Sequence, residues 1–330
     1  MFYCLFKKIY FASKSAIEKE NKKWILRECT PEDVEIKTHA YSDSGNIQHL
    51  CNICRAKSST VDFPTIIDIH GGGWLCGDKD TNSNFNCHLA VGHCNVSSLS
   101  YRTVDSGCTL IEQIQDIFAY WHFLHDNQIS LRISMDRIAL TGDSAGAQLA
   151  LLAYRVNMDK QLQRIFSVAP VKMNIRCLIL NHGVCYLDRA GALPGHPLIS
   201  RVLSIPGLQQ MLYGKNFETK DAYLHSVVPG RYIHQASDLP PVMLITSSGD
   251  DAYRYQTIDL YNELKGIGAD CHLYVEEDPN AEHVFSIANP DSAEGRKCNN
   301  RILQFIAEHC ENRGDTAVRR VKVERQPLLS

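Results

Sequence analysis

The sequence contains no long hydrophobic run, no large charge of either sign and no regular cysteine pattern. No uninterrupted apolar stretch approaches the roughly 20 residues that span a bilayer, and the apolar residues 1–6 are interrupted at once by two lysines, too early for a signal segment. The net charge of −3, with acidic and basic residues interspersed, argues against a nucleic-acid partner. The 13 cysteines are odd in number and irregularly spaced, which favours free thiols over a disulfide framework. We therefore expect a cytoplasmic protein without a membrane span.

Metal-ligand patterns are equally weak. Cys51 and Cys54 stand three apart on an expected strand, where side chains at that spacing face opposite sides. Cys87-His88 and His93-Cys94 have no second cluster to complete a zinc site. We expect neither a metal nor another cofactor.

What the chain does contain is a regular alternation of strands and helices. A hairpin is expected at residues 34–41 and 47–56, with a turn at 43–46. Apolar strands follow at about 65–70, 96–101, 137–142, 176–182, 242–248 and 271–276. Between and after them lie helical segments at about 84–93, 109–126, 145–158, 252–267 and 298–312. This pattern predicts an α/β fold with an eight-stranded, mostly parallel sheet covered by helices on both faces.

One segment departs from this alternation. Residues 187–238 are rich in proline, glycine and mixed helical signals, which indicates a lid inserted over the carboxyl ends of the strands, where open α/β sheets place their sites. Residues 1–32 are candidates for the same lid. The length suits a single domain over residues 1–313, with 314–330 as a disordered polar tail.

The strongest chemical signal is Gly142-Asp143-Ser144-Ala145-Gly146. An apolar strand precedes it and a helical run follows, which is the context of a nucleophile elbow that lifts a serine hydroxyl above a sheet. A serine needs a neutral imidazole to take its proton and a carboxylate to orient that imidazole. Asp250 follows a late strand and His283 follows the next one. The topology therefore predicts Ser144, Asp250 and His283 as a catalytic triad.

A second motif, His70-Gly71-Gly72-Gly73-Trp74, directly follows another strand. Together with the elbow and the late aspartate and histidine it resembles the hormone-sensitive-lipase-like branch of the α/β-hydrolases, over residues 34–310. Further matches are Gly77-Asp78, Tyr101-Arg102, Asp116, Asp136-Arg137-Ile138, Pro240-Pro241 and His283-Val284-Phe285. The chain lacks the family's usual Leu-Ala-Pro-Glu after Tyr101-Arg102, and its acid motif reads Asp-Asp-Ala-Tyr-Arg where Asp-Pro-Leu-Arg is common.

The resemblance implies roles for the loop residues. The amides of Gly72 and Gly73, or of Gly71 and Gly72, would join that of Ala145 to bind the developing oxyanion, while His70 orders the loop. It also leaves two acids open. Counting from Pro241 without a gap favours Asp250, whereas aligning Arg254 favours Asp251, and either could instead cap the next helix.

The resemblance further implies an α/β-hydrolase fold and hydrolysis of short-chain or small acyl esters through an acyl-enzyme, with a small-molecule ester as the partner and a monomer or dimer as the assembly. One alternative is an amidase or arylformamidase of the same fold, against which Gly73 argues because kynurenine formamidases have tyrosine there. The other is a non-catalytic ligand receptor like the plant gibberellin receptors, which resemble this family but lack the catalytic histidine; His283 argues against it.

Overall fold

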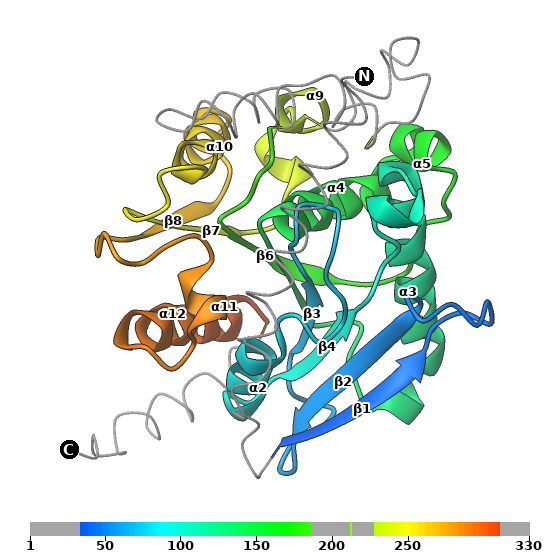
Figure 1. Ribbon diagram of the computed structural model, residues 1–330. Helices are drawn as coiled ribbons and strands as arrows, with labels where there is room; N and C mark the ends of the chain where they lie inside the picture. Colours follow the sequence, from blue (N-terminus) through cyan, green and yellow to red (C-terminus); the bar gives the residue numbers. More distant parts are fainter. Residues whose placement is uncertain (1–33, 187–211, 213–227, 311–330) are drawn as a thin grey trace, which may run out of the picture.

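The computed structural model describes residues 34–186, 212 and 228–310, and these residues form one eight-stranded sheet (Figure 1). The strand order is β1-β2-β4-β3-β5-β6-β7-β8. β1 pairs with β2 and β2 with β4 in antiparallel fashion, and all other neighbours are parallel. The strands are β1 (Val34–Ala40), β2 (Leu50–Ala56), β3 (Thr65–Ile69), β4 (Asn95–Leu99), β5 (Ile138–Asp143), β6 (Ile175–Asn181), β7 (Val242–Ser247) and β8 (Cys271–Glu276).

Helices cover both faces of the sheet, as Figure 1 shows. They are α2 (Ser83–Val91), α3 (Leu110–Leu131), α4 (Ala145–Met158), α5 (Lys160–Phe166), α9 (Pro229–Tyr232), α10 (Arg254–Gly266), α11 (Phe285–Ala288) and α12 (Ala293–Cys310), with short 3₁₀ turns η1 (Val104–Ser106) and η3 (Ala236–Asp238). Alternate strand residues supply the two cores: Leu178 and Leu180 of β6 pack with α3, α4 and α10, whereas Cys177 and Ile179 pack with α2, α11 and α12. The expected fold class is confirmed.

Several element ends differ from the sequence expectation, and exposure explains them. β2 begins at Leu50 rather than at 47, because Ile47 is 80% exposed in the turn and pairs with no strand. α3 continues to Leu131 rather than 126, since its last turns are polar and carry little apolar signal. α12 begins at Ala293 rather than 298, because its first turn is mostly polar and only from Cys298 does the apolar stripe start.

Only part of the expected lid lies within the described residues. Leu212 is buried, and residues 228–238 contain α9 and η3. The remainder of the lid at 187–238, residues 1–32 and the tail at 314–330 lie outside the described residues. Among the helices of residues 34–186 and 228–310, none has both the length and the hydropathy needed to cross a membrane.

Candidate active site

The site begins at the turn between β5 and α4, where Ser144 has φ 50° and ψ −118°. A serine in this conformation is strained, and strain of this kind is typical of functional turns. The two glycines that flank Ser144 are required because other backbone atoms lie too close to leave room for a Cβ. A Cβ on Gly142 would lie 2.4 Å from the Gly146 carbonyl oxygen, and one on Gly146 would lie 2.0 Å from that of Ile69. The elbow therefore presses α4 against β3 and β5 and presents Ser144 at the carboxyl edge of the sheet.

His283 and Asp250 come together at the same edge. His283 Nδ1 lies 2.8 Å from Asp250 Oδ2, and the Asp250 side chain is 1% exposed. Burial alone would raise the pKa of Asp250, but the hydrogen bond and charge of His283, with smaller effects of His182 and the Tyr253 amide, hold it below its ordinary value. Asp250 thus remains ionised and holds the proton of His283 on Nδ1.

Asp251, the other acid that the sequence left open, is exposed. Asp250 also stabilises the turn before α10, because its Oδ1 accepts a hydrogen bond from the Tyr253 amide at 3.1 Å. Neither acid caps α10, because its N-cap residue is Tyr253 and no side chain caps that helix. The histidine-contacting acid in this structure is Asp250.

The loop that carries His283 is held close to the loop after β7. A Cβ on Gly249 would lie 2.5 Å from the Ala281 carbonyl oxygen, so only glycine allows the two loops to approach so closely. Val284, directly after His283, has φ 54°, which is rare for a β-branched residue. Close packing of the Gly249 turn and this strained residue together fix the direction of the imidazole.

His182, which the sequence pattern did not single out, follows β6 and lies next to His283. Its ring is buried and meets the His283 ring edge-on, with 5.4 Å between centroids. Nδ1 is 2.6 Å from Asn181 Oδ1 and Nε2 is 3.1 Å from Ser247 Oγ, so Nδ1 donates and Nε2 accepts. Burial, and then the neighbouring His283, lower the pKa of His182 to about 3, so it is neutral. Its only sequence signal was a histidine at the end of a strand.

The glycine loop after β3 offers backbone donors. The Gly71 amide is already engaged, since it donates to Asp143 Oδ1 at 2.9 Å. Gly72 and Gly73 have φ of 105° and 61°, and a Cβ on Gly72 would lie 2.1 Å from the Cys76 carbonyl oxygen. Among the described residues, none accepts a hydrogen bond from the amides of Gly72, Gly73 or Ala145. Of the two pairs that the sequence allowed, the geometry favours Gly72 and Gly73.

His70 is buried next to this loop. Its ring stacks on Tyr101 with centroids 4.3 Å apart, and its Nδ1 lies 2.7 Å from the Gly71 carbonyl oxygen, to which it donates. Burial lowers the pKa of His70 to about 4, against the opposing effects of that carbonyl and Asp78. A neutral, buried His70 supports the loop through this hydrogen bond.

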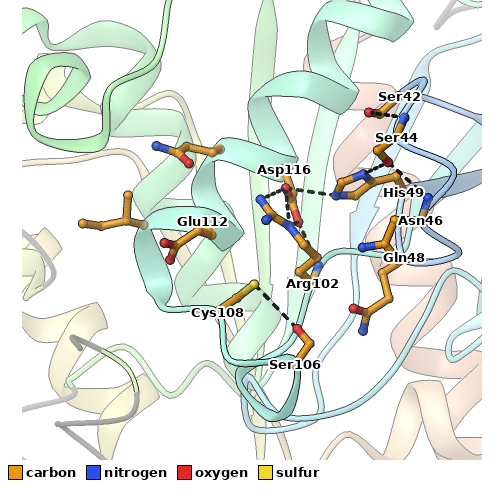
Figure 2. Close-up of polar contacts among 12 residues, drawn as sticks. Ser42, Ser44, Asn46, Gln48, His49, Arg102, Ser106, Cys108, Glu112 and Asp116 are labelled. Carbon is orange, nitrogen blue, oxygen red and sulfur yellow. Dashed lines mark hydrogen bonds and ion pairs between the residues drawn. The ribbon is translucent and has the colours of Figure 1, made fainter. Parts of the chain in front are cut away.

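A second group of a serine, a histidine and an aspartate lies elsewhere, between the β1–β2 turn and α3 (Figure 2). Ser44 Oγ is 2.6 Å from His49 Nδ1, and His49 Nε2 is 3.3 Å from Asp116 Oδ1. Arg102, however, donates to both oxygens of Asp116, from Nη2 at 2.7 Å and Nε at 2.9 Å, and the Ser44 hydroxyl also accepts the Asn46 amide. Because the guanidinium offsets the carboxylate charge, Asp116 stabilises an imidazolium poorly. These contacts connect the β1–β2 turn to α3.

Metal sites do not emerge from the described ranges, where no group of three or more histidine, cysteine or acidic side chains is placed to hold an ion. The eleven cysteines of these ranges are all free, ten of them buried. Cys87, Cys94 and their neighbouring histidines on and after α2 form no such group.

Comparison with known proteins shows the family and the fold of this chain. The sequence model of the BD-FAE family matches residues 51–264. The structure of esterase B from Lactobacillus rhamnosis (HN001) has a TM-score of 0.82 and 26% identity, covering 98% of each chain. The same esterase inhibited by a C4-C4 SN3 tributyrin phosphonate has a TM-score of 0.83 and 26% identity, over 97% of this chain and 98% of that one. A bacterial heroin esterase, at 19% identity, a TM-score of 0.70 and coverage of 91% and 92%, is similar in fold.

Proposed function

The chain belongs to the BD-FAE family, and on this premise we propose that it is a serine hydrolase that cleaves short-chain carboxylic esters, with Ser144 as the nucleophile. The observation that carries the assignment is that one edge of the sheet holds both a strained serine elbow and His283, whose Nδ1 is held 2.8 Å from a buried, ionised Asp250. The short acyl preference is supported by the related esterase B, which was captured with a tributyrin phosphonate.

The mechanism follows from these contacts. His283 keeps its proton on Nδ1, so the unprotonated Nε2 takes the proton of Ser144 as the hydroxyl attacks the ester carbonyl. The amides of Gly72, Gly73 and Ala145 donate to the oxyanion that forms, and His283 then protonates the leaving alcohol. Water, activated by the same imidazole, releases the acid from the acyl-enzyme. No step requires a metal or an organic cofactor.

The test compares Ser144 with Ser44, whose hydroxyl lies 2.6 Å from His49 Nδ1. Ser144→Ala should abolish hydrolysis of p-nitrophenyl butyrate and labelling by a fluorophosphonate probe. Ser44→Ala, which removes the serine beside His49 in Figure 2, should change neither. A chelator should leave the parent rate unchanged. Labelling that survives in Ser144→Ala, mapped by peptide mass spectrometry, would place the nucleophile elsewhere.

The substrate range needs a separate panel. Acyl esters of graded chain length should give the highest kcat/KM at the short end, and formylkynurenine in the same panel distinguishes an arylformamidase. Binding of small ligands without turnover would instead support a receptor.

We also propose that the protein works in a reducing compartment such as the cytoplasm. The free state of the eleven described cysteines supports this, because buried neighbouring thiols would pair in an oxidising environment. Cys54 and Cys87 Sγ atoms, for example, lie 3.9 Å apart without a bond.

A further inference from the structure

Two carboxyl groups lie buried behind the glycine loop, and the mechanism above uses neither of them for proton transfer. Asp68 stands in the middle of β3, two residues before His70, and Asp143 ends β5, directly before Ser144. Their strands are paired neighbours in the sheet. The two residues are 1% and 5% exposed. A buried carboxylate without a cation is costly, so such a pair needs an explanation.

One asparagine bridges the two acids. Asn82 Nδ2 donates to Asp143 Oδ1 at 2.8 Å and lies 3.2 and 3.3 Å from the two oxygens of Asp68. Asp143 Oδ1 also accepts the Gly71 amide. The chain of contacts therefore runs from Asp68 through Asn82 and Asp143 to the first glycine of the oxyanion loop.

A second asparagine, Asn86, can serve Asp68 in either protonation state. Asn86 Nδ2 lies 3.0 Å from Asp68 Oδ2, while Asn86 Oδ1 is buried and has no hydrogen-bond partner among the described residues. The oxygen and nitrogen of an asparagine side chain are exchangeable by a half-turn of the amide. After such a half-turn Oδ1 faces Asp68 Oδ2, and a protonated Asp68 has an acceptor for its hydrogen bond.

The titratable groups that face the two acids supply no permanent positive charge. Tyr101, after β4, and Tyr120, on α3, are buried, which raises the pKa of each well above its ordinary value and keeps both neutral. His283 acts on Asp143 by its charge, but only when it is protonated. The side chains hydrogen-bonded to the two acids in the described residues are both asparagines.

Burial and proximity thus favour one shared proton near neutral pH. Burial, followed by the charge of Asp143, raises the pKa of Asp68 to about 7, with Asn86 and Asn82 opposing. Burial raises the pKa of Asp143 to about 6, opposed mainly by Asn82 and the Gly71 amide. Two acids that interact in this way titrate as a pair.

We infer that Asp68 is a positioning residue for ester hydrolysis: it holds the proton of the buried pair, and this allows Asp143 to keep the Gly71 amide, and with it the oxyanion loop, in place. The inference rests on the proposed function. When the last proton leaves at alkaline pH, two anions compete for Asn82, Asp143 is pushed from its position, and Gly72 and Gly73 move with Gly71. The chemical step then slows, whereas ground-state binding of the ester changes little.

The experiment measures kcat and KM for p-nitrophenyl butyrate from about pH 6 to 9, the range in which such a pair titrates. The parent should lose kcat along an alkaline limb at nearly constant KM. Asp68→Asn keeps the shape of the side chain and cannot ionise, so it should retain kcat within about three-fold at pH 7, because an uncharged amide replaces an uncharged acid, and should lose the alkaline limb. Asp126→Asn, on the exposed face of α3, should keep the parent profile.

Asp143→Asn is the second variant, and it carries the same test should Asp68→Asn fail to fold. It also leaves one acid in the pair, so its alkaline limb should disappear even though its kcat is lower throughout. A parent-like limb in a folded Asp68→Asn or Asp143→Asn protein, with Ser144 still labelled by fluorophosphonate, would overturn this inference alone. A parent that is inactive and unlabelled would overturn the proposed function and this inference with it.

Discussion

Replacement of Asp250 by asparagine tests the assigned triad most sharply, because both oxygens of the native carboxylate have known partners. Oδ1 accepts the Tyr253 amide at 3.1 Å, and Oδ2 lies 2.8 Å from His283 Nδ1. The Tyr253 amide can only donate, so the asparagine must keep its oxygen there and turn its NH₂ toward His283. Nδ1 then has to accept, and the imidazole proton moves to Nε2, the atom that must take the proton of Ser144.

The expected loss in kcat is about 10⁴, the value for the same change in the best-studied triad, which corresponds to about 5.4 kcal/mol of transition-state stabilisation. Asp251→Asn is the matched control. Its side chain is exposed, and we expect turnover within about two-fold of the parent, the range of surface changes.

The assay is kcat on p-nitrophenyl butyrate, with thermal unfolding to show that both variants are folded. If Asp251→Asn is the more damaged enzyme, or if a folded Asp250→Asn protein keeps more than about a tenth of the parent turnover, the argument from the Asp250 contacts is wrong.

Three further predictions concern stability and thiol chemistry. Gly146→Ala puts a Cβ 2.0 Å from the Ile69 carbonyl oxygen and should destabilise the fold by about 3 kcal/mol or more, whereas Gly45→Ala, opposed only by its φ of 69°, should cost about 1–2 kcal/mol; urea midpoints that rank them in reverse would contradict this. Burial raises the pKa of Asp68 in the folded state to about 7, above its unfolded value of about 4. The free energy of unfolding of the parent should therefore fall by up to about 4 kcal/mol, relative to that of Asp68→Asn, as the pH rises from about 4 through 7. The same pH dependence of the melting temperature in both proteins would contradict this. Alkylation after denaturation without reductant should modify all 13 cysteines, and a smaller mass increase would reveal disulfides.

Most of the fold was predictable because the signals that encode it are local. Continuous apolar strands separated by helical periodicity identify a parallel sheet with two covered faces, and each strand of the structure lies within a few residues of its expected place. The ends were less predictable, as Ile47 illustrates: an apolar residue extended the expected β2 into an exposed turn. The local sequence pattern reports only hydrophobicity. A strand, however, ends where the neighbouring strand stops offering hydrogen-bond partners.

The site divides in the same way. Glycine spacing around Ser144 and the strand positions before Asp250 and His283 are written in the sequence, because an elbow and a loop after a strand depend on neighbours along the chain. The choice between Asp250 and Asp251 depends on which side chain the end of β7 turns inward, and that is decided by packing against the His283 loop.

Other features exist only once distant segments meet. His182 follows β6 and His283 follows β8, and the two meet because both strands pair with β7 in the sheet. The Gly71 amide is occupied because Asp143 comes from the neighbouring strand. Asp68 was visible as an acid within an apolar strand, but its relation to Asp143 required the pairing of β3 with β5. Sequence alone determined the order of the elements and the serine elbow. The tertiary structure decided which buried polar groups meet and share hydrogen bonds, because those energies depend on burial and on distances between residues far apart in the chain.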